Sequence, residues 1–280
     1  MSAPCATAVF LAKLFDMTKT QKELAFLRDL YIQGEWTQRF TDLVDKHMDL
    51  RDSENMLYIN AGTGAHAMAI HERFGEKTDI FASCEHEDML AIARDKAAAV
   101  SSGVDFSTIR FEDDAFDAVL ADASFIRPAD LETFIENTVR VSRTGGDIAI
   151  YLPTAGSYGE VFSLMWEVLF NEDLAEHGAA VEKLVAELPT VSYIEEIAKR
   201  AGLVNINTQI ANEVFEYENG EEFIVSPLVA DFLMPIWLET LDEEEKERAV
   251  KQLAQLIDAE DGTLSFRFSV KATLLTGEKN

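Results

Sequence analysis

Residues 56–75 read MLYINAGTGAHAMAIHERFG and contain the order of elements that decides the fold. The apolar run MLYIN at 56–60 predicts a short buried strand, and it leads directly into the glycine-containing loop AGTG at 61–64. The stretch AHAMAIHERFG at 65–75 predicts a helix that Gly75 closes. In a strand, a glycine loop and a helix in this order, the glycines let a ligand approach the backbone and the start of the helix has free N–H groups. A tight turn with only a structural role would have the same pattern.

The alternation of strands and helices continues to residue 153. The periodicity predicts helices at 88–96 and 128–143, the second with Pro128 in its first turn and Gly145-Gly146 at its end. The predicted strands lie at 78–84, 98–104, 115–122 and 147–153. This alternation predicts an α/β fold, a doubly wound and mostly parallel sheet with helices on both faces. Such sheets bind ligands beyond the carboxyl ends of their strands, where the strand order reverses.

The segments on either side of this core have different patterns. Residues 6–50 read as helices, with Leu24, Leu27, Leu30 and Tyr31 at helical spacing and a break at Gly34. The N-terminal run MSAPCATAVFLAKLF lacks a basic start, so we expect a helix there rather than a signal peptide. The second half predicts an apolar helical insert at 157–186, helices at 188–203 and 242–258, and strands at 204–217 and 264–277.

Composition excludes several classes of partner. The 280 residues carry a formal net charge of −27 and contain no basic stripe, so nucleic acid and anionic membrane surfaces are not expected partners. The sequence has no apolar run of the ~18–20 residues that a membrane span requires. Two cysteines, Cys5 and Cys84, form neither a disulfide framework nor a metal-binding pattern, so we expect a cytoplasmic protein without a metal site. The sequence leaves open a homo-oligomer.

Four stretches in order carry a resemblance to a known family. They are MLYINAGTG (56–64), SCEHEDMLAIAR (83–94), VDFSTIRFEDDAFDAVLAD (104–122) and RVSRTGGDIAIYLP (140–153). Over about residues 55–155 the chain resembles class I S-adenosylmethionine-dependent methyltransferases, above all the small-molecule type of ubiquinone and menaquinone biosynthesis. The resemblance implies a Rossmann-like, seven-stranded sheet with an antiparallel C-terminal strand, and S-adenosylmethionine as cofactor. We then expect one domain over 1–280, divided into an N-terminal helical cap (1–52), a cofactor-binding core (55–155), an insert or lid (157–187) and the C-terminal half of the sheet (188–280).

The resemblance also implies a set of cofactor-binding residues. The loop glycines would let the backbone approach the methionine part of the cofactor, and Glu85 would accept hydrogen bonds from the ribose hydroxyls, with Cys84 as the other candidate for that place. Asp105 would bind the adenine amino group, beside Phe106 and Met89. The full set is Asn60, Ala61, Gly62, Gly64, Glu85, Met89, Asp105, Phe106 and Ala121.

The sequence departs from the family pattern at two positions of the first motif. Tyr58 stands where the family has an acidic residue, and Asn60 replaces the first glycine of the loop. Asparagine adopts the left-handed backbone more readily than most residues, so Asn60 is compatible with the turn. Tyr58 removes one expected anchor for the cofactor amine.

Methyl transfer needs alignment and exclusion of water more than a catalytic signature. A general base is required only if the acceptor loses a proton. The candidates for that base are His66, Tyr151 and Tyr158, although a surface position for His66 and packing roles for the tyrosines are open alternatives. The apolar stripe of the insert is either core or the wall of an acceptor pocket.

Three functions follow from these patterns. The leading hypothesis is methyl transfer to a small, apolar or aromatic acceptor. The alternative is a methyltransferase-like protein that has lost cofactor use and acts as a binding or interaction protein, a hypothesis motivated by Tyr58 and Asn60. A nicotinamide dehydrogenase is the weakest hypothesis, because Ala67 stands at the position of the third glycine in the glycine pattern of those enzymes. Alanine sometimes replaces that glycine, so the pattern alone does not exclude this function.

Overall fold

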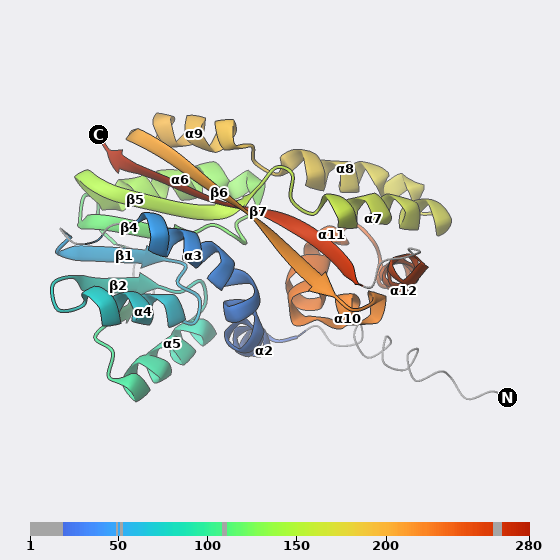
Figure 1. Cartoon of the computed structure of the whole chain (residues 1–280), viewed down its shortest axis with the longest axis horizontal. Coiled ribbons are helices and arrows are strands. Elements are labelled where there is room, and N and C mark those ends of the chain that lie inside the picture. The colour runs from blue at the N-terminus through green and yellow to red at the C-terminus, as the bar shows by residue number, and fades with distance from the viewer. Residues whose placement is uncertain (1–18, 49, 51–52, 108–110, 260–264) are drawn as a thin grey trace. The chain divides into compact units, whose positions relative to one another are not determined.

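The computed structural model describes residues 19–48, 50, 53–107, 111–259 and 265–280. These fall into two compact units (Figure 1). The larger unit comprises Gln21–Ala155, Pro189–Ala211 and Lys271–Asn280, and the smaller one Met1–Thr20, Gly156–Leu188 and Asn212–Val270. The expected helix at the start of the chain lies outside the described residues. The single domain expected over 1–280 stays a prediction.

A seven-stranded sheet with the order β3-β2-β1-β4-β5-β7-β6 forms the frame. The strands β1 to β5 pair in parallel, whereas β7 runs antiparallel to β5. Their bounds are β1 Asn55–Ile59, β2 Asp79–Ser83, β3 Asp105–Ser107, β4 Phe116–Asp122, β5 Ser142–Thr154, β6 Leu203–Tyr217 and β7 Phe266–Lys279. This topology confirms the predicted fold class, and the strand order reverses between β1 and β4, which is where such sheets bind ligands.

Helices cover both faces of the sheet in the larger unit. Thr190 caps the N-terminus of α9 by accepting a hydrogen bond from Tyr193 N at 3.2 Å, as the Pro-Thr signal at 189–190 predicts. The helical segments are α2 Gln21–Leu27, η1 Arg28–Thr37, α3 Gln38–His47, α4 Ala65–Phe74, α5 Glu87–Val100, η2 Pro128–Asp130, α6 Leu131–Val141 and α9 Val191–Arg200.

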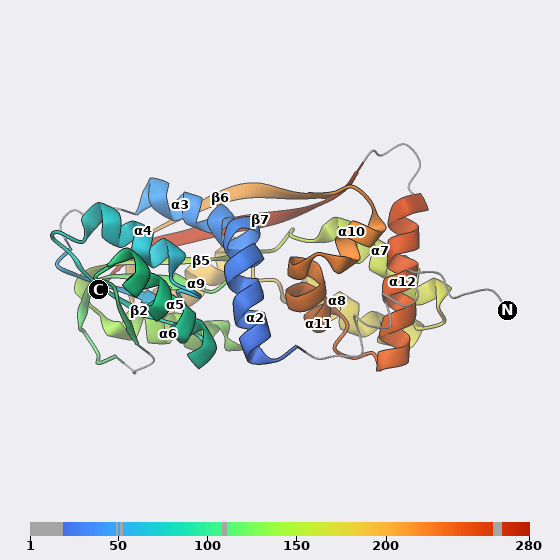
Figure 2. The same cartoon turned by 90° about the horizontal axis from the view of Figure 1, so that it is seen from below.

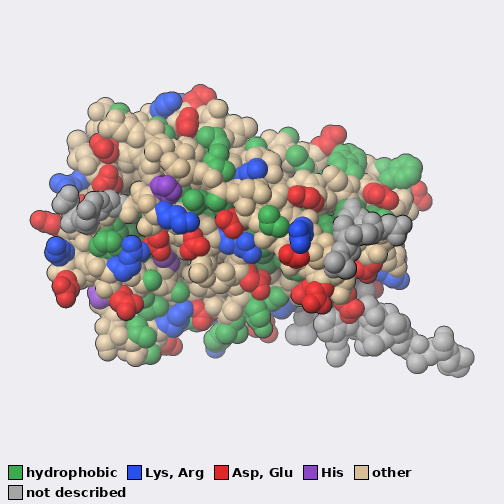
Figure 3. Space-filling model, in the orientation of Figure 1, with side chains coloured by type: hydrophobic (Ala, Val, Ile, Leu, Met, Phe, Trp, Pro, Cys, Tyr) green, Lys and Arg blue, Asp and Glu red, His purple; other side chains and the backbone are tan. Residues whose placement is uncertain are grey.

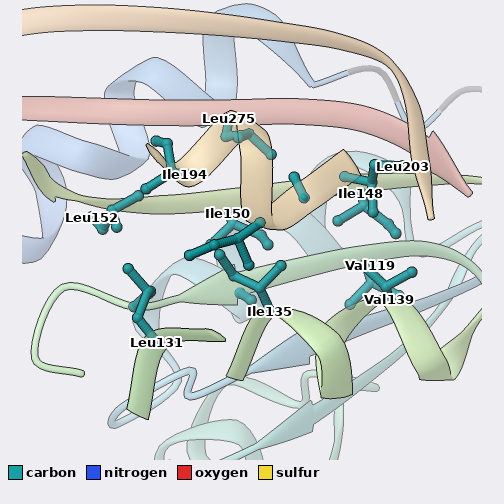
Figure 4. Close-up of a cluster of buried hydrophobic side chains, with 14 of the residues drawn as sticks. Val119, Leu131, Ile135, Val139, Ile148, Ile150, Leu152, Ile194, Leu203 and Leu275 are labelled. Carbon is teal, nitrogen blue, oxygen red and sulfur yellow. The ribbon is translucent and has the colours of Figure 1, made fainter. Parts of the chain in front are cut away.

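Alternate residues of the strands face two different layers. One face packs against α6 and α9 in an entirely apolar cluster, in which Ile135 and Ile194 meet the strand residues (Figure 4). The other face carries Tyr58 and Tyr151, and there the ring of Phe40 from α3 stacks on Tyr151 with ring centroids 5.7 Å apart. The buried hydroxyls of Tyr58 and Tyr151 therefore lie on the α3 side of the sheet.

The smaller unit is mostly helical around an aromatic cluster. Phe268 from β7 lies at its centre and is fully buried. Its ring stacks on Phe215 with centroids 4.9 Å apart and contacts three further aromatic rings: Tyr158, Tyr217 and Phe223. The helical segments, seen from a second side in Figure 2, are α7 Gly159–Asn171, η3 Ala175–His177, α8 Gly178–Glu187, α10 Gly220–Val225, η4 Leu228–Leu233, α11 Met234–Trp237 and α12 Glu243–Ala259.

Two predicted element boundaries in the core are wrong. No strand forms at 98–104: residues 98–100 end α5, because the run of alanines before Val100 favours helix, residues 101–104 form a turn and a connection, and β3 begins at Asp105. Gly145-Gly146 do not separate α6 from the next strand. They lie within β5, in a register shift opposite β4, where a Cβ on Gly146 would come within 2.9 Å of the Asp117 carbonyl.

The N-terminal helices also differ from the prediction. No break occurs at Gly34, because α2, η1 and α3 follow one another without a gap. The predicted apolar face is wrong: Leu30 is 70% exposed, and the buried residues are Ala25, Arg28, Ile32 and Trp36. The cause is the π-helical segment η1, in which the period of the helix differs from the one used for the prediction.

The surface charge and the helices of the described residues can be compared with the expectations from composition. On the face in Figure 3, acidic side chains are interspersed with Lys and Arg rather than gathered in one patch. Among the described residues, no helix combines the length and the apolar character that crossing a membrane would take.

Candidate functional site

The loop between β1 and α4 carries three residues in the left-handed backbone conformation. Asn60 has φ 58°, Gly62 φ 58° and Gly64 φ 80°, so the predicted tolerance of asparagine at position 60 is confirmed. The Asn60 amide donates a hydrogen bond to the Asp122 carbonyl at 3.1 Å, which ties the loop to the end of β4. The Ala61 N–H donates to the Ser83 carbonyl at the end of β2. The loop therefore lies at the carboxyl ends of three neighbouring strands.

Glu85 faces this loop from the end of β2. Its Oε2 accepts a hydrogen bond from Gly62 N at 3.1 Å, and its Oε1 accepts one from Arg28 Nη2 at 2.9 Å. The neighbouring Cys84 is buried, and burial raises the pKa of its thiol to about 12. Of the two candidates for this place, Glu85 thus presents a carboxylate to the loop.

Arg28, at the start of η1, lies over the same loop. It is 7% exposed. Its Nη2 lies 3.5 Å from Asp122 Oδ2 as well as 2.9 Å from Glu85, and its guanidinium carbon lies 4.6 Å from the centre of the Phe125 ring. A Cβ on Gly62 would lie 3.8 Å from Arg28 Nε. The guanidinium therefore fills the space above the bare glycine.

Asp122 is the second carboxylate at this point and ends β4. Burial raises its pKa, and the charge of Arg28 acts in the opposite direction. Its Oδ1 accepts a hydrogen bond from Ser124 N at 2.7 Å. Sequence reasoning included Asp122 only within the range 121–125 expected to line the cleft, and it missed Arg28, since an arginine in a helix is by pattern an ordinary surface residue.

A chain of polar side chains leads away from Asp122 on the α3 side of the sheet. The hydroxyls of Tyr58 and Tyr151 lie 2.7 Å apart, His66 Nδ1 lies 3.3 Å from the Tyr58 hydroxyl, and His66 Nε2 lies 3.4 Å from Asp45 Oδ1. Burial first, and the charge of Asp122 second, raise the pKa of both tyrosines. The phenols are thus neutral at ordinary pH, and Tyr58 occupies the family's acidic position with a buried hydrogen-bonding role.

We predict that Tyr58→Phe lowers the free energy of unfolding by about 1–2 kcal/mol, because Tyr151 and His66 each lose a buried partner. Urea unfolding followed by circular dichroism measures this change. The matched control is Tyr193→Phe, since Tyr193 is exposed and loses the same atom. Equal effects of the two substitutions would contradict the role assigned to the hydroxyl pair.

Three further candidate residues lie in different parts of the structure. Asp105 begins β3 opposite Phe81, which is four positions before Glu85 along β2, and it is exposed. Ala121 is fully buried in the apolar cluster under α6. Tyr158 lies in the smaller unit, in the aromatic cluster around Phe268.

Of the two remaining candidates, Phe106 packs against the loop. Phe106 is buried, and a Cβ on Gly64 would lie 2.5 Å from its ring, so Gly64 must be glycine for close packing as well as for its backbone. Arg94 donates two hydrogen bonds to the Phe106 carbonyl, at 3.1 and 2.8 Å. Met89 is buried near the start of α5.

The comparison with known families finds a methyltransferase domain at residues 56–146, which spans β1 to the start of β5. A demethylmenaquinone methyltransferase of Shouchella clausii is 26% identical over 149 residues. That match covers 51% of this chain and 63% of the relative's length.

Solved structures share the fold. The YcgJ protein of Bacillus subtilis has a TM-score of 0.55 at 16% identity, over 87% of this chain and 99% of its own. Phosphoethanolamine N-methyltransferase 2 of Haemonchus contortus, solved with phosphomonomethylethanolamine and S-adenosylhomocysteine, has a TM-score of 0.55 at 16% identity, over 96% of this chain and 60% of its own. Residues 56–146 therefore match a methyltransferase domain, and the strand order and these likenesses show that the chain has the fold of these methyltransferase structures.

Proposed function

We propose that the chain transfers the methyl group of S-adenosylmethionine to a small, apolar or aromatic acceptor. One observation carries the proposal: the Glu85 carboxylate at the end of β2 is hydrogen-bonded to Gly62 in the loop after β1. A carboxylate beside a bare, left-handed glycine loop, at the point where strand order reverses, has the chemistry to hold the ribose of a nucleoside cofactor.

The residues around the loop fit this cofactor. Glu85 would hold the ribose hydroxyls, and the left-handed loop at Gly62 would admit the methionine part against bare backbone. The cofactor supplies an activated methyl group on a sulfonium, so the protein contributes alignment and exclusion of water. Asn60 keeps the backbone of the glycine it replaces, which weakens the argument for the alternative of a protein that has lost cofactor use.

The acceptor class rests on the side chains beside Arg28. The fully buried Trp36 lies with its ring centroid 5.5 Å from that of Phe125 and 5.1 Å from that of Phe40. An acceptor that took the place of Arg28 on the half-buried Phe125 would meet this cluster, and aromatic side chains bind apolar and aromatic molecules through contact area. The buried Asp122 is the carboxylate available to accept a proton if the acceptor must lose one.

The test is calorimetric titration of the purified chain with S-adenosylhomocysteine, after mass spectrometry has shown whether a ligand copurifies. We expect one site with a dissociation constant in the micromolar range, and then methylation of small aromatic acceptors from labelled S-adenosylmethionine. A folded chain without binding up to millimolar ligand would refute cofactor use. Binding without transfer to any apolar or aromatic acceptor, but with transfer to a polar one, would refute the acceptor class alone.

A further inference from the structure

The segment α2–η1 is fastened to the loop and to α5 by two neighbouring residues. Arg28 donates to the Glu85 carboxylate. Asp29 Oδ1 accepts a hydrogen bond from the Thr63 hydroxyl at 2.6 Å and another from the Lys96 ammonium. The three partners of this pair, Thr63, Glu85 and Lys96, come from the loop after β1, the end of β2 and helix α5.

The space that Arg28 fills is the space that the proposed cofactor needs. Glu85 Oε1 is bound to Arg28 and Oε2 to Gly62 N, so both oxygens of the carboxylate already accept hydrogen bonds. The guanidinium also covers the open side of Gly62. Arg28 therefore covers both the Glu85 carboxylate and the open side of Gly62 in this structure.

The segment that delivers Arg28 has an unusual backbone. η1 is a π-helix of ten residues that begins at Arg28, between two α-helices. π-Helical turns are rare and occur mostly as short interruptions of α-helices at functional sites. A change of η1 to α-helical hydrogen bonding would shift Arg28 and Asp29 relative to α3, so the backbone itself offers a second arrangement of the segment.

We infer that Arg28 and the α2–η1 segment form an internal plug, which competes with the cofactor for Glu85 and must leave before the cofactor binds. This inference rests on the proposed function. When Arg28 leaves, Glu85 Oε1 becomes free to accept a hydrogen bond from a ribose hydroxyl. A plug that is closed in ten of eleven molecules lowers the apparent affinity about ten-fold, since only the open fraction binds.

The test measures S-adenosylhomocysteine affinity in wild type, Arg28→Gln and Asp29→Asn. Arg28→Gln removes the competing charge, and Asp29→Asn weakens the attachment of the segment without touching Glu85. We expect Arg28→Gln to lower the dissociation constant about ten-fold and Asp29→Asn to lower it less. The matched control is Lys22→Gln, an exposed position on α2 where the same charge is lost and the affinity stays unchanged.

Hydrogen exchange followed by mass spectrometry provides the second measurement. Addition of S-adenosylhomocysteine to the wild type should increase amide exchange across residues 21–37, because a displaced plug loses its attachments. Increased protection of that segment, or affinity that is unchanged or weaker in Arg28→Gln, would overturn the plug while cofactor binding in the wild type upheld the proposed function. Absence of binding in every folded variant would overturn both.

Discussion

Glu85→Ala is expected to weaken S-adenosylhomocysteine binding by roughly 100-fold. The ribose hydroxyls would lose a charged acceptor, and two hydrogen bonds to a charged group are together worth about 3 kcal/mol. The variant also loses the hydrogen bond to Gly62 N, so the loop is less fixed in the free protein and binding must order it. Calorimetric titration of the folded variant measures the change directly.

Asp105→Ala is the informative control for this prediction. The resemblance to the family assigns Asp105 to the adenine, whereas the structure places it, exposed, at the start of β3 and four positions short of Glu85. We expect less than a three-fold change in affinity for Asp105→Ala. A loss as large as that of Glu85→Ala would assign Asp105 to the cofactor site, and an unaffected Glu85→Ala would remove the carboxylate from the site.

Phe268→Ala is expected to lower the free energy of unfolding by about 3–5 kcal/mol. The ring is fully buried and contacts four other aromatic rings, so its removal leaves a cavity that these rigid neighbours fill poorly. For a chain of this size such a loss lowers Tm by roughly 10 °C. Differential scanning calorimetry measures it, and also shows whether the transition remains single.

The same substitution at Phe170 isolates the effect of burial. Phe170 belongs to the same unit but is 78% exposed on α7, so Phe170→Ala should change the stability by no more than about 0.5 kcal/mol. Comparable losses for Phe170 and Phe268 would mean that the aromatic cluster is not the core of the smaller unit.

Much of the fold could be read from the sequence because its signals are local. The strand at 56–60, its glycine loop and the helix after it follow from neighbouring residues, and so does the place of Glu85 at the end of the next strand. The capped helix after Pro189 is confirmed for the same reason. Each of these predictions depends on residues within one or two turns of the chain.

The parts that could not be predicted depend on distant partners. Arg28 is 57 positions from Glu85 in the sequence, and its burial follows from that contact rather than from helical spacing. The spacing of Leu30 predicts a core position, yet the π-helical period turns it outward. The role of Asp105 rests on resemblance alone, because the register of a three-residue strand has no sequence signal of its own.

Two of the three segments of the smaller unit, 156–188 and 212–270, interrupt the chain of the larger unit. The residues that flank the first segment are joined by a hydrogen bond of 2.9 Å, which Ala155 N donates to the Pro189 carbonyl. The second segment begins within β6 and ends within β7, and these two strands are neighbours in the sheet. Each segment therefore has adjacent ends, as insertions acquired by an older, shorter domain would have. Replacing both with short turns is a direct design route to a minimal domain built on the same parallel sheet.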